Sequence, residues 1–335
     1  MRKTAGIIAA IAITASALIA APAHAAGTTI TAGGSSFAGG MVATCAANYN
    51  DATVNYNPEG SGGGKTKFAA GTYDFAGTDS LYAAGTEPKS FTYVPLLGGP
   101  IALAFNVDGV KNLRLDANTV SGIFMGTITK WNDAAIANLN KGVKLPASAI
   151  TPEYRGGTSG TTNNFAGYLK ANTNAGWTQN DSWSLSTGKA TPAGTANANS
   201  TALIASVKAT PNSIGYVDLK DAISSNLPYA FLKNAAGQFV KPTPAAAAKF
   251  LSTMTPNANG SVTIDWAKKV PGAYNASLFT YGLGRTTTST NGEAVKSFFN
   301  YMLNTCVPAN ATRLGFVALT GAIKAKALAL AATIK

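Results

Sequence analysis

Histidine is almost absent from this chain of 335 residues, and its one histidine, His24, lies within Ala23-His24-Ala25. Small residues on both sides of such a position, after an apolar stretch, are typical of a signal-peptidase site. We therefore expect cleavage after Ala25 and a mature protein without histidine. Because histidine is the commonest general base and a common metal ligand, its absence favours binding over catalysis, with no metal and no cofactor.

The first 25 residues carry the other marks of a secretion signal. Arg2 and Lys3 give a positive start, and residues 5–21 are apolar or small apart from two hydroxyl residues. Residue 26 is alanine and not cysteine, so no lipid anchor is expected. We predict that residues 1–25 are a signal peptide and that the mature protein is periplasmic or secreted. An uncleaved membrane anchor is the alternative, although about 17 residues are few for a bilayer.

Acidic residues are also scarce: 14 stand against 26 lysines and arginines, for a formal net charge of +12, or +10 without Arg2 and Lys3. Charged residues make up only 12% of the chain, and no block of lysine or arginine occurs. A diffuse positive field raises the encounter rate of small anions, whereas nucleic acid binding favours clustered basic residues. We therefore expect a small anionic partner and no nucleic acid.

Only two cysteines occur, Cys45 and Cys306. In an oxidising compartment they can pair only with each other inside the chain. Cys45 follows Phe37 and Met41 at four-residue spacing, and Cys306 ends a similar apolar pattern that starts at Val295, so each lies on the buried face of a predicted helix. We predict a disulfide that ties the beginning of the chain to its end; two buried free thiols are the alternative.

Short apolar runs alternate with helical patterns along the chain. The strand-like runs are residues 93–97, 101–107, 213–217 and 278–282. Such alternation predicts an α/β fold. The mature chain is too long for one ordinary core, so two domains are expected.

Three segments rich in glycine and hydroxyl residues each precede a helical pattern. They are Gly33-Gly34-Ser35-Ser36-Phe37, Gly60-Ser61-Gly62-Gly63-Gly64-Lys65 and Arg155-Gly156-Gly157-Thr158-Ser159-Gly160-Thr161-Thr162. Glycines let the backbone approach a ligand closely, hydroxyls donate hydrogen bonds, and the first N–H groups of a helix have no partner within it. One such segment alone is usually a turn or a cap. Three of them in a cationic protein predict a cradle for an anion.

Two charged residues fit such a cradle. Arg155 is one of four arginines in the mature chain, and its planar fork matches two oxygens of a tetrahedral oxyanion. A surface salt bridge is the alternative for Arg155, and a turn or cap is the alternative for Asp79. An ionised aspartate only accepts hydrogen bonds, so Asp79 beside an anion favours a ligand that carries a proton, as phosphate does and sulfate does not.

Enzyme motifs find little support. Gly64-Lys65-Thr66 imitates the end of a P-loop, but position 59 is glutamate where that motif needs its first glycine. A serine hydrolase or a zinc site lacks its histidines, and no close carboxylate pair indicates a glycosidase.

In the order of these segments the chain resembles the phosphate-binding proteins of phosphate ABC transporters, over essentially all of the mature sequence. Two runs carry the resemblance most specifically: Gly126-Thr127-Ile128-Thr129-Lys130-Trp131-Asn132-Asp133, and Arg155 followed by Ser159-Gly160-Thr161. The resemblance implies an α/β fold of two lobes with a hinge, in the periplasmic-binding-protein-like (type II) architecture. We expect lobe one to comprise residues 26–104 and 280–335, and lobe two residues 105–279.

The resemblance also implies a function and a set of ligand residues. The protein would capture inorganic phosphate between its lobes and deliver it to a membrane permease of an ABC transporter, as a monomer and not as an enzyme. Another oxyanion such as sulfate or molybdate, a secreted phosphatase-like hydrolase, and a surface interaction protein without a ligand are the alternatives. The implied phosphate-binding residues are Ser36, Phe37, Ser61, Asp79, Arg155, Ser159, Gly160 and Thr161.

The chain departs from this family at three positions. Position 36 is serine where the family often has threonine, which keeps the hydroxyl. The acidic residue usually found two positions after the arginine is replaced by Gly157, and Glu59 brings a carboxylate close to the second cradle. We expect Gly157 to leave Arg155 less well oriented and the site weaker than is usual in the family.

Overall fold

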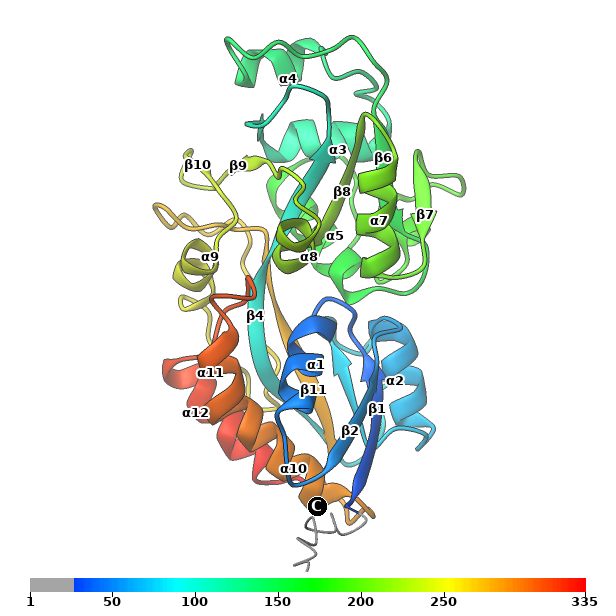
Figure 1. The fold of residues 1–335 in the computed structure, drawn as a ribbon, viewed down its shortest axis with the longest axis vertical. Coiled ribbons are helices and arrows are strands. Elements are labelled where there is room, and N and C mark those ends of the chain that lie inside the picture. Colours follow the sequence, from blue (N-terminus) through cyan, green and yellow to red (C-terminus); the bar gives the residue numbers. More distant parts are fainter. Residues whose placement is uncertain (1–26) are drawn as a thin grey trace, which may run out of the picture.

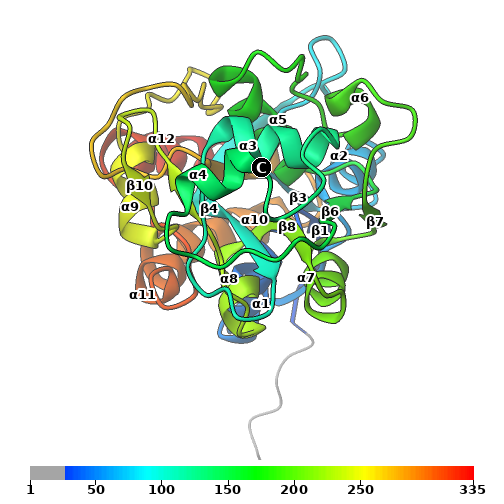
Figure 2. The same ribbon diagram turned by 90° about the horizontal axis from the view of Figure 1, so that it is seen from above.

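The computed structural model describes residues 27–335, which form two lobes stacked along the long axis of the molecule (Figure 1). The predicted signal peptide, residues 1–25, lies outside the described residues. Among residues 27–335, no helix has the length and apolar character needed to cross a membrane. The two lobes share one curled sheet of eight strands, and Figure 2 shows helices on both sides of it.

The sheet has the strand order β2-β1-β3-β11-β4-β8-β6-β7. Its first three strands are parallel, β11 and β4 are antiparallel to their neighbours, and β8, β6 and β7 are parallel again. A second, small sheet has the order β10-β9-β5. The strands are β1 (Thr29–Gly34), β2 (Thr53–Asn57), β3 (Phe75–Thr78), β4 (Phe91–Asn106), β5 (Arg114–Leu115), β6 (Thr151–Arg155), β7 (Thr195–Asn197), β8 (Ser213–Asp218), β9 (Phe231–Lys233), β10 (Phe239–Val240) and β11 (Ser277–Arg285).

Strand β4 joins the two lobes. Its residues 91–100 pair with β11, and its residues 101–106 pair with β8. The predicted strands at 93–97 and 101–107 are therefore one strand, which runs through Gly98, Gly99 and Pro100. A Cβ built at Gly99 would lie 3.0 Å from the ring of Phe37, so glycine permits close packing where turn residues suggested a break.

The helices pack around these strands. Near β1, β2 and β3 lie α1 (Gly39–Ala47) and α2 (Ser61–Ala69), and the chain ends in a helical group beside β11 and β4. That group is α10 (Gly292–Tyr301), the π-helical turn η1 (Met302–Cys306), α11 (Val307–Asn310) and α12 (Gly321–Ala331). The helices of the other lobe are α3 (Ala117–Met125), α4 (Ala134–Leu139), α5 (Gly160–Asn172), α6 (Trp183–Thr187), α7 (Ser200–Ala209) and α8 (Leu219–Ser224).

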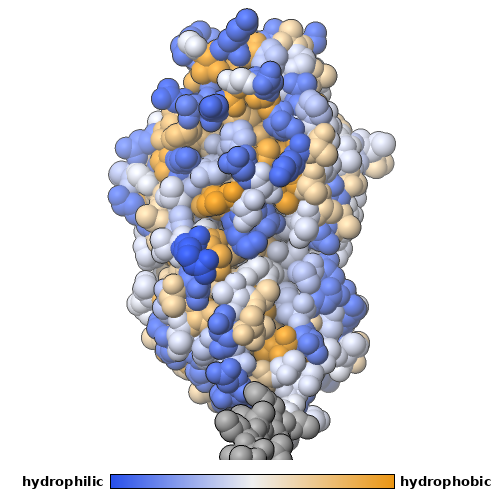
Figure 3. All heavy atoms as spheres, in the orientation of Figure 1, coloured by the Kyte–Doolittle hydropathy of each residue, from blue (hydrophilic) through white to orange (hydrophobic). Residues whose placement is uncertain are grey.

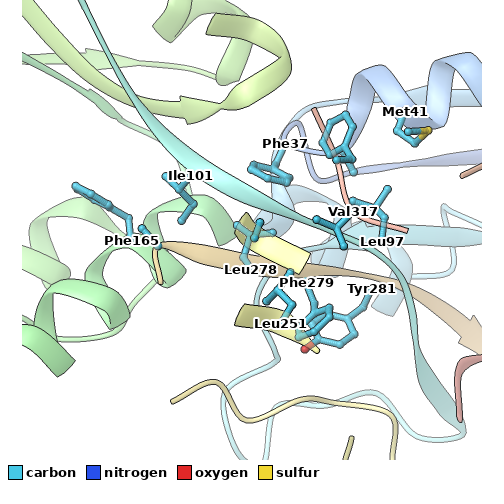
Figure 4. Close-up of a cluster of buried hydrophobic side chains, with 14 of the residues drawn as sticks. Phe37, Met41, Leu97, Ile101, Phe165, Leu251, Leu278, Phe279, Tyr281 and Val317 are labelled. Carbon is cyan, nitrogen blue, oxygen red and sulfur yellow. The ribbon is translucent and has the colours of Figure 1, made fainter. Parts of the chain in front are cut away.

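The helix α9 (Pro244–Leu251) packs against β4 and β11, at the level where the lobes meet (Figure 1). Its Leu251 lies in the same buried cluster as Leu97, Leu278 and Phe279 (Figure 4). The boundary between the lobes in this part of the chain stays a prediction. So does the expected division into lobe one, residues 26–104 and 280–335, and lobe two, residues 105–279.

The surface mixes polar and apolar residues. On the face drawn in Figure 3 hydrophobic residues gather only in small groups. Among residues 27–335 the large exposed apolar side chains are Leu81, Leu185 and Ile223, which come from separate parts of the chain. Single exposed apolar residues are ordinary on soluble proteins. The predicted monomeric state stays a prediction.

The predicted disulfide is confirmed: Cys45 of α1 and Cys306 of η1 are bonded, with 5.6 Å between their Cα atoms. Both side chains are buried, as the apolar spacing indicated. The second helix is less regular than expected, because its last turn is a π-helical one before Pro308, which has no backbone N–H to donate. The bond joins two elements of the same lobe.

Replacing both cysteines by alanine should lower the free energy of unfolding by about 2–5 kcal/mol, because the bond closes a long loop in the unfolded chain. Urea denaturation of the wild type and the double variant measures this difference. Dithiothreitol should lower the stability of the wild type and leave the double variant unchanged. Equal midpoints for the two oxidised proteins would contradict the role of the bond in stability.

Candidate functional site

The candidate site lies where the carboxyl ends of parallel strands from both lobes meet. Ser36 follows β1 and Asp79 follows β3, whereas Arg155 is the last residue of β6 in the other lobe. Ligands of open α/β sheets bind outside the carboxyl ends of their strands. The helices α1, α2, α5 and α7 all begin at residues of this place or within a few residues of them, so the positive ends of their dipoles lie close to it.

Asp79 is buried and surrounded by hydroxyl groups. Its Oδ1 accepts hydrogen bonds from Ser35 Oγ at 2.6 Å and Thr280 Oγ1 at 2.7 Å. From the described residues its Oδ2 has two long contacts, of 3.5 Å each, with Ser61 Oγ and Thr161 Oγ1. Oδ1 is therefore occupied, and Oδ2 is the oxygen that can accept a proton from a ligand. The Ser61 and Thr161 hydroxyls can turn from Oδ2 to a ligand oxygen.

The environment of Asp79 disfavours its charged form. Burial raises the pKa of Asp79 to about 6, although the bonds from Ser35 and Thr280 and the positive charge of Arg155 lower it. The carboxylate of Asp181 adds a smaller upward shift. At neutral pH the carboxyl is still mainly ionised, so it acts as an acceptor.

Arg155 is only 2% exposed and forms no ion pair with any residue between 27 and 335. Its Nη1 donates to Ser36 Oγ at 3.0 Å and to Ser200 Oγ at 3.3 Å, and its Nη2 donates to the Ala198 carbonyl at 3.4 Å. Its Nε has no hydrogen-bond partner within the described residues. Burial lowers the pKa of Arg155, with the charge of Asp79 acting against that shift. A buried guanidinium with neutral partners and one free donor is suited to an anion.

The two hydroxyls beside Arg155 leave one proton for a ligand. Ser36 Oγ and Ser200 Oγ lie 3.0 Å apart, and each accepts a bond from Nη1. One hydroxyl can donate to the other, and the proton of the second is then free to point at an anion. The site therefore offers many donors and, at Asp79, a single charged acceptor.

Glycines let the backbones of the lobes meet. A Cβ built at Gly160 would lie 2.5 Å from Ser61 Oγ, and one built at Gly62 would overlap the side chain of Thr158. The Gly62 N–H also donates to the Thr158 carbonyl across the lobes, at 3.2 Å. The glycines predicted to admit a ligand thus serve close contact between the lobes as well.

The remaining predicted residues lie on the same surface. Ser159 caps α5 by accepting a bond from the Thr162 N–H at 3.2 Å. Phe37 turns its ring into the buried apolar cluster (Figure 4), where it packs edge-on against Phe316, so its ring is not available to a ligand. The structure brings the eight predicted residues into one region, and their role in ligand binding stays a prediction.

Sequence analysis did not assign Ser35, Thr280 or Ser200 to the site. Ser35 lies in the first glycine-rich segment, in which the resemblance implies a ligand role for its neighbour Ser36. Ser200 follows Asn199, which caps α7, and this cap was the available signal. Thr280 lies in the middle of β11 next to a shift in strand register, and nothing local in the sequence marks it.

Two of the departures from the family pattern, Glu59 and Gly157, concern charge, and Glu59 does not contact the site. Glu59 pairs with Lys67 at 2.7 Å and accepts a bond from Tyr73, so its charge is used within its own lobe. Gly157 is exposed and lies outside the left-handed region, and a Cβ built there would meet only the Ala198 carbonyl, at 3.6 Å. Within residues 27–335 no carboxylate pairs with Arg155 in place of the missing partner, so a weaker site stays a prediction.

These features define a class: two α/β lobes with a buried site between them are the architecture of extracytoplasmic binding proteins. A family model described as PBP superfamily domain matches residues 19–305. The structure resembles a high affinity periplasmic phosphate-binding protein, PfluDING, with a TM-score of 0.74 and 21% identity, over 90% of this chain and 93% of that one. A phosphate-binding protein from Stenotrophomonas maltophilia has a TM-score of 0.70 and 19% identity, with the same coverage.

Sequence relatives narrow the class further. Phosphate-binding protein PstS of Xylella fastidiosa (strain Temecula1 / ATCC 700964) is 35% identical over 224 residues, which cover 64% of this chain and 60% of that protein. Phosphate-binding protein PstS 3 of Mycobacterium leprae is 34% identical over 267 residues, 73% of this chain and 70% of that protein. The chain belongs to the PBP superfamily and, within it, to the family of these phosphate-binding proteins.

The raised pKa of Asp79 predicts a pH dependence of stability. Because its folded pKa, about 6, exceeds the ordinary value of 3.8, folding favours the protonated form. The contribution of Asp79 to stability is present below pH 4 and is lost as the pH rises through 6, by about 3 kcal/mol in total. In Asp79→Asn this loss should disappear, so its stability relative to wild type should rise between these pH values. Urea denaturation without added anion measures it, and parallel pH curves for the two proteins would contradict the assignment.

Proposed function

We propose that this protein captures inorganic phosphate between its lobes and delivers it to the membrane permease of an ABC transporter. The observation that carries the proposal is the pairing of many donors with one acceptor oxygen, Asp79 Oδ2. Phosphate at neutral pH has oxygens for the donors and at least one proton for that acceptor. Sulfate and molybdate dianions have no proton, so they would face an unpaired carboxylate.

The ligand would be held by both lobes. Ser36, Ser61 and Asp79 belong to the lobe that contains β1, and Arg155 and Thr161 belong to the other. Arg155 would contribute Nε and part of its fork, and the helix N-termini would contribute backbone N–H groups. A ligand that bonds to both lobes favours the closed arrangement by its differential affinity for it.

Binding without catalysis agrees with the relatives, which are named as binding proteins. Capture of phosphate outside the cytoplasmic membrane would agree with the predicted signal peptide at residues 1–25 and with the structural neighbour named as a periplasmic phosphate-binding protein. The mature protein would reach the permease by diffusion in the periplasm or at the cell surface.

Calorimetric titration with phosphate and with sulfate tests the ligand. We expect the wild type to bind phosphate and to discriminate against sulfate by roughly 10⁴-fold or more. Arg155→Met should weaken phosphate binding about a thousandfold, because it removes charged donors worth several kcal/mol together. Equal affinity for the two anions would exclude Asp79 as the selective group.

Arg313→Met is the matched control, because it removes the same charge from an exposed side chain whose one partner among residues 27–335 is Asn310. It should leave the affinity within about twofold of wild type, since salt screens distant surface charges. A similar loss of affinity in both variants would assign the effect to net charge.

An assay for phosphoester turnover tests the alternative that the protein is a hydrolase. Turnover by the wild type would contradict binding as the sole function.

Gly62→Ala should weaken phosphate binding by at least tenfold, because the new methyl group would meet the side chain of Thr158 and keep the lobes apart. Adding Thr158→Gly should restore most of the affinity, since the remaining contact with the backbone oxygen is 3.2 Å. Titrations of the single and double variants check this, with Thr158→Gly alone as the control. If Thr158→Gly does not restore the affinity of Gly62→Ala, the methyl group acts within α2 and not on the contact between the lobes.

A further inference from the structure

Lys65 lies in the part of α2 that imitates a P-loop, and it takes no part in the site described above. Its Nζ donates to Ser80 Oγ at 3.0 Å and to the Leu81 carbonyl at 2.9 Å, and it lies 5.7 Å from the centre of the Tyr82 ring. These contacts are within its own lobe. The same nitrogen forms an ion pair of 2.8 Å with Asp181, which belongs to the other lobe.

Asp181 lies just before α6 and is fixed from its own side. Its Oδ1 accepts a bond from Asn163 Nδ2 at 2.9 Å, and its backbone carbonyl accepts one from the Ser159 N–H at 3.0 Å. Its Oδ2 accepts bonds from Lys65 Nζ and, at 2.9 Å, from Ser80 Oγ. Asp181 therefore links the first residues of α5 to the opposite lobe.

The pair lies at the rim of the space between the lobes. The Lys65 and Asp181 side chains are 12% and 14% exposed, and they line a cleft of about 390 Å³ to which both lobes contribute. Separation of the lobes would break only the two bonds that Asp181 Oδ2 accepts, from Lys65 and from Ser80. Lys65 would keep its bonds to Ser80 and Leu81, and Asp181 would keep those from Asn163 and Ser159, so little order has to be gained on closure. A pair that is largely shielded from water and already oriented contributes more than an exposed one.

We propose that Lys65 and Asp181 form a latch that closes only when the lobes meet and that sets the affinity for phosphate without touching it. This inference rests on the proposed function of the site. Because Asp181 is anchored to Ser159, closing the latch also holds the start of α5 against Ser61 and Asp79. The latch adds to the stability of the closed form, and the apparent affinity rises with the population of that form.

A different model makes opposite predictions for one variant. If the two charges acted only through their fields on the anion, Lys65 would attract phosphate and Asp181 would repel it. Removing Asp181 would then tighten binding. If the latch operates, removing either partner weakens binding, and removing both costs little more than removing one.

The test is a double-mutant cycle of Lys65→Met and Asp181→Asn, with phosphate affinity from calorimetry and rates from stopped flow. We expect each single variant to bind phosphate about tenfold more weakly, and the double variant to match the singles within about threefold. The loss should lie in faster dissociation, because the latch forms after the encounter and does not steer it.

Lys67→Met is the matched control. Lys67 lies in the same helix and forms a 2.7 Å ion pair with Glu59, but both partners belong to one lobe. It should keep the wild-type affinity within about twofold. Circular dichroism of all variants identifies any that do not fold, and Lys65→Arg, which keeps the charge and a donor, should recover most of the affinity of the wild type.

Several results would overturn the latch, among them tighter binding by Asp181→Asn, additive losses in the double variant, and a loss confined to the association rate. Unchanged affinity in Lys65→Met would also overturn the latch. If the wild type binds phosphate in that experiment, the proposed function still stands. A wild type that binds no phosphate would overturn the proposed function first, and the latch with it.

Discussion

Two opposite charges, Asp79 and Arg155, are buried between the lobes without forming an ion pair in the described part of the chain, and the rest of the site follows from this constraint. Removing a charge from water is costly unless hydrogen bonds replace the water. Hydroxyls supply those bonds at Asp79, while one donor of Arg155, Nε, finds no partner among residues 27–335. A protonated anion between the two would satisfy both, because it accepts from the guanidinium and donates to the carboxylate.

The same constraint explains why small residues surround the site. Two backbones must approach within hydrogen-bond distance, as they do where the Gly62 N–H meets the Thr158 carbonyl, and larger side chains would keep them apart. Serine and threonine add donors with little volume. Longer polar side chains, such as Lys65 and Asp181, lie at the rim, where there is room for them. Recognition and closure therefore use the same surface, with different residues at its centre and its edge.

Much of this could be predicted from sequence because the signals were local. Glycine and hydroxyl residues before apolar helical patterns marked three loops of the site, and the rarity of arginine drew attention to Arg155. The disulfide followed from a count of two cysteines and their apolar spacing. The α/β class followed from short apolar runs, although Gly98 to Pro100 concealed the continuity of β4.

What could not be predicted depends on contacts between distant segments. Thr280 reaches Asp79 over 201 positions of sequence and carries no local mark. Ser200 meets Ser36 over 164 positions, and its only local signal is the helix cap at Asn199, which does not by itself indicate a ligand site. Glu59 seemed to threaten the second cradle because it adjoins it in sequence, but its side chain turns to Lys67 and Tyr73. Adjacency in sequence does not show where a side chain points.

The position of β11 has a consequence for the order in which the molecule assembles. This strand lies between β3 and β4 in the sheet, yet it comes after residue 276 in the chain. In a chain made from its N-terminus, β1, β2 and β3 can pair with one another, but the outer edge of β3 must wait for a neighbour encoded near the other end. The strands β8, β6 and β7 meet their partners sooner, since all of them lie between residues 101 and 218. Pairings between distant segments form slowly and leave strand edges exposed meanwhile. The lobe that holds β1 and the C-terminal helices is thus the last to be completed, and a nascent chain depends longest on protection of the edge of β3.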